Sequence, residues 1–468
     1  MEQIEEFVRA ANGQDGVELH GLMVLRHGEV LAQGWWEPYG PAKPHLLYSL
    51  SKSFTSTALG FAVAEGSVDL DATVLSYFPE FDDRVTDDRS RAMKVRHVAA
   101  MSSGHLDETI EQAWRAGEGD LLLGLLLLPP ERDPGTVFAY NQPCTYAMSA
   151  IVQRVSGVPL TEYLRPRLFE PLGIGTYGWV RDRNGRDIGF SGLYTTTEAI
   201  ARLGQLYLRE GEWEGRRLLP AEWVAEATRP HIATGRDDPD WDQGYGFQFW
   251  RSRHGYRGDG AYGQFMLILP EQDAVVAMTS QSPNMQGLLD AAWEHLLPAL
   301  KAERHSSETW NCRTRPLTWS PPSAGMGPAA EAGAVPVGAG AAAALGDAVY
   351  RPGSGNELAT LQTVTVDGDR LTLADHGKPL ELRLGHEGWT ETGPVATART
   401  ATGVDVVFAE TPHRLHLDLD AADHTFAARW ETAPLDPAPP LSVMRMPRLR
   451  QVPHGAGTAA HHSGPELA

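Results

Sequence analysis

The sequence predicts an α+β protein, in which an antiparallel sheet is flanked by helices and is followed by a smaller all-β domain. Two apolar runs flank a glycine-containing turn near the N-terminus, and apolar helical patterns fill much of the chain after them. A later region alternates apolar and polar residues with a period of two. Because 468 residues exceed one ordinary hydrophobic core, we expect two domains.

The elements of the first domain follow in chain order. A hairpin is predicted to turn at His27 and Gly28, and a helix ending near residue 209 is predicted to begin at a Thr195 or Thr196 cap. The short link 270–273 makes the two strands beside it antiparallel neighbours. The other predicted helices are 49–64, 95–105, 146–155, 160–168 and 288–300, and the strands are 245–250, 265–269 and 274–279. Residues 110–128 are a leucine-rich apolar run that ends before two prolines.

Composition divides the chain into four segments. The catalytic candidates all fall in residues 1–305, and a Gly/Ala/Pro-rich, almost uncharged stretch at 306–344 is typical of a linker. Short strands at 361–366, 370–373, 380–384, 404–408, 415–419 and 426–430 predict a small β-sandwich or barrel. We expect this β-domain to span 345–448, followed by a flexible tail at 449–468.

The charge balance excludes several classes of partner. A net charge of -20 argues against nucleic acid and against anionic membrane surfaces, and it favours neutral or cationic ligands. The acidic N-terminus lacks the features of a signal peptide, so we expect a cytoplasmic protein without a membrane span. With only Cys144 and Cys312 we expect no structural disulfide, and no Cys/His spacing indicates a metal site or cofactor.

One stretch carries the chemistry, the Ser-x-x-Lys of residues 49–52 at the start of an apolar helix. Lys52 lies three residues after Ser49 on one helix face, so its ammonium can reach the serine hydroxyl. A serine hydroxyl needs such activation to act as a nucleophile. Backbone amides in the first turn of a helix have no partner within the helix, so that of Ser49 can face a developing oxyanion.

Several ordered motifs of the first three hundred residues resemble the serine β-lactamase and penicillin-binding-protein superfamily, in its class C-like branch of esterases, peptidases and acyl transferases. The resemblance implies that Ser49 is the nucleophile, Lys52 its proton partner and Tyr140 the tyrosine of the second motif. It also implies an appended lipocalin-like barrel for the C-terminal domain. The matching stretches are 48–55, 101–104, 138–141, 192–195 and 267–273.

The chemistry of Tyr140 follows from its expected neighbour. An ammonium group lowers the pKa of a nearby tyrosine, so Tyr140 beside Lys52 is predicted to act as a general base toward Ser49 and later as an acid toward the leaving group. The family usually carries asparagine or serine two residues after this tyrosine, and this chain has Gln142. Glutamine retains an amide donor and acceptor on a longer stem, so we expect the contact to persist with shifted geometry.

The third motif is the larger departure, because Gly258-Asp259-Gly260 replaces the family's Lys-Thr-Gly or His-Thr-Gly. The amide of Ala261 can still complete an oxyanion hole with that of Ser49. The missing cation helps hold a β-lactam carboxylate, and Asp259 would repel it, so we predict weak or absent β-lactamase activity. Arg257 and His254 are nearby substitutes, although a strand can direct them away.

Further residues are candidates for the substrate pocket. Asp259 and Gly260 are expected to border the substrate together with Gln142. His105, Trp114 and Tyr262 are candidates for lining the pocket, with ordinary packing as the equally favoured alternative. Residues 173–178 match the glycine spacing of a dinucleotide loop but follow a helix, which is typical of a connector.

We therefore expect serine-dependent acyl transfer through a Ser49 acyl-enzyme that hydrolyses a small ester or amide. One alternative is a transacylase that passes the acyl group to an amine in small-molecule biosynthesis. The other is a binding or sensor protein on the same fold, which the intact Ser49, Lys52 and Tyr140 oppose. The oligomeric state and the role of the β-domain stay open.

Overall fold

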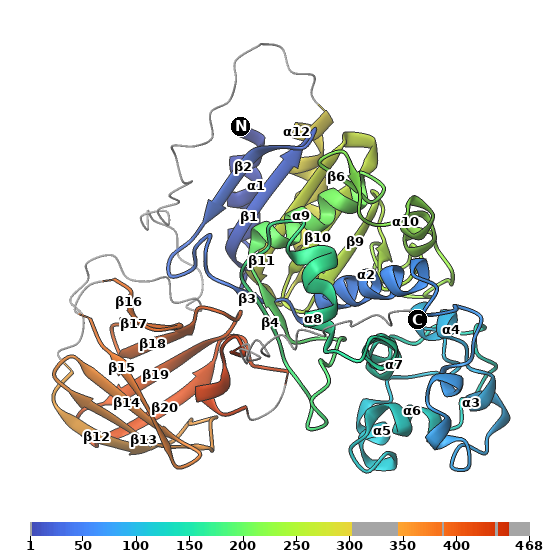
Figure 1. The fold of residues 1–468 in the computed structure, drawn as a ribbon. Helices are drawn as coiled ribbons and strands as arrows, with labels where there is room; N and C mark the ends of the chain where they lie inside the picture. The colour runs from blue at the N-terminus through green and yellow to red at the C-terminus, as the bar shows by residue number, and fades with distance from the viewer. Residues whose placement is uncertain (1, 302–344, 386–387, 436–438, 449–468) are drawn as a thin grey trace, which may run out of the picture.

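The computed structural model describes residues 2–301, 345–385, 388–435 and 439–448. A larger part with mixed helices and strands comes first, and a barrel-like sheet follows it along the chain (Figure 1). The predicted linker at 306–344, the tail at 449–468 and Cys312 lie outside the described residues.

Six strands form the central sheet of the first part, in the order β2-β1-β11-β10-β9-β8, and neighbouring strands are antiparallel. The predicted hairpin is confirmed, and His27 and Gly28 in its turn have φ angles of 55° and 80°. Positive φ at both central residues matches the twist of the flanking strands. The strands are β1 (Glu18–Arg26), β2 (Glu29–Trp35), β8 (Trp250–Arg251), β9 (Tyr256–Gly260), β10 (Gln264–Leu269) and β11 (Ala274–Gln281).

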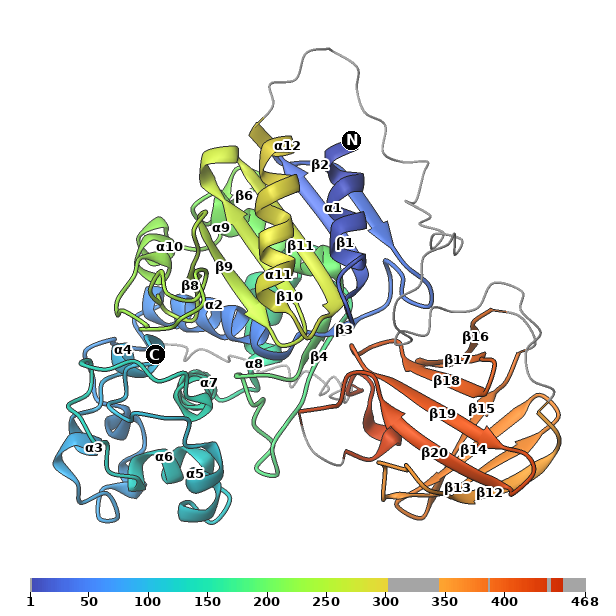
Figure 2. The ribbon, with the colours of Figure 1, turned by 180° about the vertical axis from the view of Figure 1, so that it is seen from behind.

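Helices cover both faces of this sheet. On the face seen in Figure 2, α1, α11 and α12 pack over the strands, in a core that includes Phe7 and Phe265. On the face seen in Figure 1, α2 and α9 pack against side chains such as Ile268, in a second core that includes Phe54. The covering helices are α1 (Glu2–Asn12), α2 (Ser51–Ala64), α9 (Thr197–Leu208), α11 (Met285–Ala291) and α12 (Leu297–Lys301).

The apolar run at 110–128 forms two helices. Glu118 and Gly119 between them have φ angles of 53° and 86°, which a right-handed helix cannot contain. Asp120 then caps the second helix by accepting hydrogen bonds from the amides of Leu122 and Leu123. The remaining helices are α3 (Asp88–Ala92), α4 (Val95–Ala99), α5 (Ile110–Ala116), α6 (Leu121–Leu127), α7 (Gln142–Ser156), α8 (Leu160–Leu164) and α10 (Ala221–Thr228).

The predicted strand at 245–250 is wrong over most of its length, because only Trp250 belongs to a strand. Gln248 has a φ of 65°, and its buried amide donates to the Ala99 carbonyl at 2.8 Å and accepts from the Thr145 hydroxyl at 2.6 Å. These tertiary hydrogen bonds override the local alternation. Small sheets elsewhere contain β3 (His45–Leu46), β4 (Tyr177–Trp179), β5 (Leu193–Thr195), β6 (Glu212–Trp213) and β7 (Arg216–Arg217).

The C-terminal part is one nine-stranded sheet, in the order β15-β14-β13-β12-β20-β19-β18-β17-β16. Its two ends meet, since the amide of Arg383 donates to the Thr392 hydroxyl at 2.7 Å and the Thr397 hydroxyl donates to the Arg383 carbonyl at 2.5 Å. The expectation of a small barrel is confirmed by this nearly closed sheet. Its strands are β12 (Ala348–Pro352), β13 (Leu361–Asp367), β14 (Arg370–Asp375), β15 (Lys378–Arg383), β16 (Thr390–Thr392), β17 (Val395–Arg399), β18 (Gly403–Phe408), β19 (Arg414–Asp420) and β20 (Thr425–Trp430).

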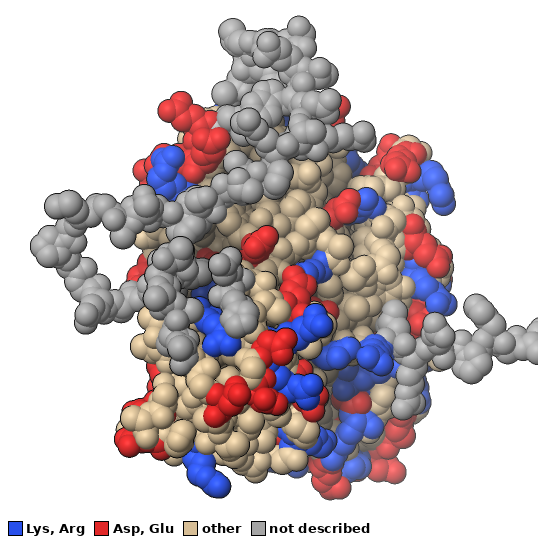
Figure 3. Space-filling view, turned by 90° about the vertical axis from the view of Figure 1, so that its left-hand side faces the viewer, with Lys and Arg blue, Asp and Glu red and all other residues tan. Residues whose placement is uncertain are grey.

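Charged side chains are mixed on the surface drawn in Figure 3, where lysines and arginines lie among aspartates and glutamates. Charged side chains of the described residues also form ion pairs at the surface, such as Arg96 with Asp71 at 2.7 Å. Among the helices of the described ranges, none has the length and apolar character needed to cross a bilayer.

Candidate active site

Ser49 lies in a 3₁₀ turn, Tyr48–Leu50, that leads directly into α2. From Ser51 to Ala62 every residue of α2 is buried, because the helix packs between the sheet, α7 and α10. A helix enclosed on all sides holds its first turn in a fixed position. The Ser49 side chain therefore occupies a defined place on the wall of the cavity described below.

Lys52 contacts the Ser49 hydroxyl, as the spacing predicts. Its Nζ lies 3.0 Å from Ser49 Oγ, 2.5 Å from Gln142 Oε1 and 2.8 Å from the Phe190 carbonyl oxygen, and none of these groups is charged. Burial lowers the pKa of Lys52 to about 7, although the more distant carboxylates of Glu108 and Asp259 oppose this effect. Near neutral pH a large fraction of Lys52 is therefore uncharged and able to accept a proton.

The structure corrects the predicted pKa of Tyr140. Burial raises this pKa above its ordinary value, and the charge of Asp259 adds to the rise, while a side-chain hydrogen bond with Ser49 only partly opposes it. The Tyr140 ring stacks on Trp250 with centroids 5.3 Å apart, and Lys52 Nζ lies 4.8 Å from the Tyr140 ring centroid. The ammonium thus faces the ring, and the phenol stays protonated and suits a donor better than a base.

Gln142 keeps the amide contact expected of its position, because its Oε1 accepts from Lys52. It is the first residue of α7, and its backbone amide donates to both oxygens of Glu108 at 3.1 and 3.2 Å. Sequence reasoning missed Glu108, which no motif indicates. Its carboxylate is the largest charge effect that raises the pKa of Lys52.

The end of β9 packs against the turn that holds Ser49. A Cβ atom on Gly260 would lie 2.0 Å from the Leu47 carbonyl oxygen and 3.1 Å from the Leu50 amide, so only glycine permits this approach. The next residue, Ala261, packs in a cluster with Tyr48. This places the backbone of Ala261 beside the Ser49 turn.

Asp259 does not present the exposed negative charge expected from the sequence. It is 7% exposed, and its carboxylate accepts from Arg257 Nε at 3.1 Å. Arg257 is fully buried and also donates to the Asp240 carbonyl and the Ser252 hydroxyl, while His254 packs against the Trp293 ring. Neither of these basic residues lines the cavity as the structure describes it.

A cavity of about 770 Å³ opens over Ser49, between the first part and the C-terminal part. The described lining includes Glu108 and Glu111 but no lysine or arginine, and Trp114 and Gln142 border it as predicted. One wall belongs to the C-terminal part and is mostly apolar: Thr411, His413, Pro434, Leu435, Pro439, Val443 and Met444.

The other predicted pocket residues lie outside this described lining. His105 is 2% exposed and binds the Ser103 hydroxyl and the Leu128 carbonyl through its two ring nitrogens, at 2.9 and 3.1 Å, so packing explains it. Gly260 contributes close backbone packing and no side chain. Tyr262 stands at the edge of the site, with its ring centroid 5.5 Å from that of Tyr48.

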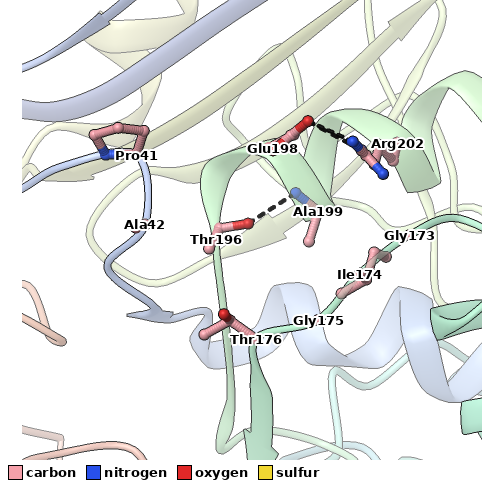
Figure 4. Close-up of a pocket in the computed structure, with 10 residues that line it drawn as sticks. All are labelled: Pro41, Ala42, Gly173, Ile174, Gly175, Thr176, Thr196, Glu198, Ala199 and Arg202. Carbon is pink, nitrogen blue, oxygen red and sulfur yellow. Dashed lines mark hydrogen bonds and ion pairs between the residues drawn. The ribbon is translucent and has the colours of Figure 1, made fainter.

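A second cavity of about 310 Å³ lies at the start of α9 (Figure 4). Its lining includes Gly173 and Gly175 of the predicted connector, which joins a helical turn to β4. Thr196 caps α9 by accepting from the Ala199 amide, as predicted, and Glu198 pairs with Arg202. These polar groups already have partners. In the described ranges, no group of three or more His, Cys, Asp or Glu side chains is arranged to hold a metal ion.

Known proteins share part of this sequence. The chain is 27% identical over 288 residues to the 6-aminohexanoate-dimer hydrolase of Paenarthrobacter ureafaciens, covering 56% of this chain and 72% of that protein. It is 29% identical over 181 residues to Esterase EstB of Burkholderia gladioli, covering 34% of this chain and only 46% of the esterase.

Solved structures share the fold at lower identity. EstCE1, described as a hydrolase with promiscuous acyltransferase activity, matches with a TM-score of 0.52 and 17% identity, over 62% of this chain and 98% of that chain. The octameric penicillin-binding protein homologue from Pyrococcus abyssi matches with a TM-score of 0.51 and 16% identity, over 90% of this chain and 96% of that chain. The second match therefore extends beyond the first part into the C-terminal part.

The Beta-lactamase family model matches residues 4–301, which is most of the chain and includes every catalytic candidate. The protein accordingly belongs to the β-lactamase family, as a member of its superfamily of serine hydrolases and acyltransferases.

Proposed function

We propose that this protein transfers acyl groups through a Ser49 acyl-enzyme and that it hydrolyses a small ester or amide. The observation that carries the proposal is the 3.0 Å contact between Ser49 Oγ and the Nζ of a buried lysine, whose pKa is lowered to about 7. A base with this pKa is matched to work at neutral pH.

The reaction begins when neutral Lys52 takes the Ser49 proton as Oγ attacks the substrate carbonyl carbon. The carbonyl oxygen becomes an oxyanion, which the amides of Ser49 and Ala261 stabilise. As the intermediate collapses, the bond to the alcohol or amine breaks, and that leaving group takes a proton from the Lys52 ammonium, either directly or through the Tyr140 phenol, which Lys52 then reprotonates. Water then attacks the acyl-enzyme while neutral Lys52 takes a proton from it. The second intermediate collapses, Ser49 Oγ leaves and regains its proton from Lys52, and the acid is released.

The cavity favours neutral or cationic substrates. Glu108 and Glu111 border it, and the described lining contains no lysine or arginine that would hold an anion. The name of the relative from Paenarthrobacter ureafaciens identifies it as the hydrolase of an aminohexanoate dimer. We propose linear amides and esters that carry an amino group as the first substrates to test.

Intact-protein mass spectrometry after exposure to a panel of activated esters tests the acyl-enzyme. We expect an adduct on the wild type and none on Ser49→Ala, a variant that keeps the backbone amide of the proposed oxyanion hole. An equal adduct on Ser49→Ala would refute the assignment of the nucleophile. Folded wild type with neither adduct nor turnover would favour the binding or sensor role.

A transacylase is the second candidate, and the same two glutamates support it because they would attract an amine acceptor. In this version the amine attacks the acyl-enzyme in place of water and an amide forms. Adding amines to the preformed acyl-enzyme distinguishes the two functions. Release of amide faster than release of free acid would establish transacylation, whereas unchanged release of acid would establish hydrolysis.

A further inference from the structure

The C-terminal part contacts the first part close to the nucleophile. The Leu46 amide donates to the Glu410 carbonyl at 2.7 Å, and within the C-terminal part the Glu410 carboxylate accepts from the Met446 amide at 2.5 Å. Arg414, 5% exposed, pairs with Glu18 at 2.5 Å. The C-terminal part therefore contacts the first part through buried polar groups, and one of these contacts lies on the segment that leads to Ser49.

Two further contacts with the C-terminal part involve tyrosines that flank the proposed oxyanion hole. Tyr48 precedes Ser49, and its hydroxyl lies 2.6 Å from His413 Nε2. Tyr262 follows Ala261, and its hydroxyl donates to the Ala433 carbonyl at 2.6 Å. Each residue that supplies an oxyanion amide thus has a neighbour anchored to the C-terminal part.

Both tyrosines have backbone angles that large residues rarely adopt. The φ angles are 47° for Tyr48 and 66° for Tyr262, in the left-handed region that favours glycine. Such a conformation costs free energy and persists only where the surroundings hold it. The two rings also meet edge to face, and the His413 ring lies 5.9 Å from Tyr48 and 5.7 Å from Tyr262. The anchored side chains therefore stabilise one another.

His413 has a fixed orientation for this contact. Its Nδ1 lies 2.9 Å from the Thr432 carbonyl oxygen, which can only accept, so Nδ1 carries the proton and Nε2 accepts from the Tyr48 hydroxyl. Burial lowers the pKa of His413 to about 4, so the ring keeps this acceptor across the neutral range.

We infer that the C-terminal part positions the oxyanion hole, through a tyrosine clamp in which His413 anchors Tyr48 and the Ala433 carbonyl anchors Tyr262. The clamp rests on the proposed function, because it matters only if the amides of Ser49 and Ala261 hold an oxyanion. These residues position the catalytic groups and do not contact the reacting atoms. The barrel then completes the active site, in addition to lining it.

The test measures single-turnover acylation of full-length variants by an activated ester, together with kcat and KM. Tyr48→Phe and Tyr262→Phe remove one hydroxyl each, His413→Phe removes the acceptor, and His413→Gln retains an acceptor near the Nε2 position. Glu391→Gln is the matched control, because it breaks the 2.6 Å ion pair between Lys43 and Glu391, a contact between the two parts away from the cavity.

We expect Tyr48→Phe, Tyr262→Phe and His413→Phe each to slow acylation about tenfold with little change in KM. This loss is smaller than the roughly hundredfold or greater loss expected when an oxyanion donor is removed outright. Tyr48→Phe combined with His413→Phe should be no slower than either alone, because both break one hydrogen bond. His413→Gln should recover most of the loss seen in His413→Phe, and Glu391→Gln should stay within about twofold of the wild type.

Acylation within twofold of wild type in both tyrosine variants would overturn the inference, as would an equal loss in Glu391→Gln, which would indicate a general effect of the domain contact. Thermal unfolding of each variant identifies a loss caused by misfolding. If His413→Phe misfolds, faster acylation in a folded His413→Gln supports the clamp, and acylation in His413→Gln as slow as in His413→Phe contradicts it. If the wild type itself forms no acyl-enzyme, the proposed function fails. A wild-type adduct with unaffected variants refutes the clamp alone.

Discussion

Two buried basic side chains in this protein have pKa values shifted in opposite directions. Lys52 in the first part meets the neutral oxygens of Ser49, Gln142 and Phe190, and burial lowers its pKa to about 7. His416 in the barrel lies 2.6 Å from Asp405 and also bonds Glu431. Burial lowers the pKa of His416, but the hydrogen bonds and charges of these two carboxylates outweigh it and raise the value to about 9.

The difference shows that the hydrogen-bonding partners, and not burial alone, decide whether a buried basic side chain is charged at neutral pH. Both side chains are nearly inaccessible to solvent, at 1% exposure for Lys52 and 4% for His416. Neutral acceptors hold the Lys52 amine without stabilising its charge, so it can lose a proton at neutral pH. Carboxylates keep His416 charged, so it serves as a structural cation. Three predictions test this contrast, and a fourth tests the charge of the cavity lining.

The largest effect is expected from Lys52→Met, which keeps a long apolar stem and removes the amine. We expect kcat for an activated ester to fall about 10³-fold, within the range that a general base contributes. Lys94→Met is the control, because Lys94 pairs with Asp71 at the surface. A tenfold or smaller loss in Lys52→Met would mean that another group takes the Ser49 proton.

The second effect is on the stability of the barrel. His416→Gln should lower the free energy of unfolding by about 2–3 kcal/mol near pH 6, as the raised pKa implies. Because the folded-state pKa is above the unfolded value, this contribution is complete below about pH 6.5 and is lost as pH rises through about 9. Denaturation at pH 6 and pH 10 should give a gap between the two proteins that closes at pH 10. A gap independent of pH would contradict the charged state of His416.

A smaller effect is expected from Glu108→Gln. The Glu108 carboxylate raises the pKa of Lys52, so its neutralisation should move the acid limb of the pH–rate profile to lower pH. The plateau rate should stay within about threefold of the wild type. Glu111→Gln should leave the profile in place, because Glu111 is exposed and paired with Arg115. A shift to higher pH in Glu108→Gln would show that Lys52 is not the titrating group.

The smallest signal is expected with β-lactams, for which we predict weak or absent turnover. The sequence suggested two reasons, and only the missing cation remains, because Asp259 is bound to Arg257 and lies outside the described cavity lining. The described cavity lining has no lysine or arginine to hold the β-lactam carboxylate. Rapid hydrolysis of nitrocefin by the wild type, lost in Ser49→Ala, would contradict this.

The sequence was sufficient for the groups whose spacing is local. Ser49 and Lys52 share one turn, and the hairpin and several barrel strands follow from turn residues and alternation. It failed for the pKa of Tyr140, because the sequence identifies a neighbouring cation but not the burial that outweighs it. The Phe190 contact was equally hidden, since a backbone carbonyl carries no sequence signal.

Long-range partners were also beyond prediction. His413 lies 365 residues from Tyr48 along the chain, and no motif connects the barrel to the nucleophile. Tyr48 and Tyr262 adopt left-handed φ angles, which the sequence does not indicate because neither residue is a glycine. Strand 245–250 failed for a related reason, because its conformation depends on hydrogen bonds from Gln248 to α7 and to the end of α4.

The most direct measurement is the rate constant for acylation of Ser49 as a function of pH, followed by quenched intact-mass spectrometry with an activated ester. If Lys52 is the buried neutral base, the rate constant should rise with pH through about 7 and level off above it. A rate constant that does not change between pH 6 and pH 9, or that is still rising steeply near pH 10, would show that burial does not prepare Lys52 to accept the serine proton.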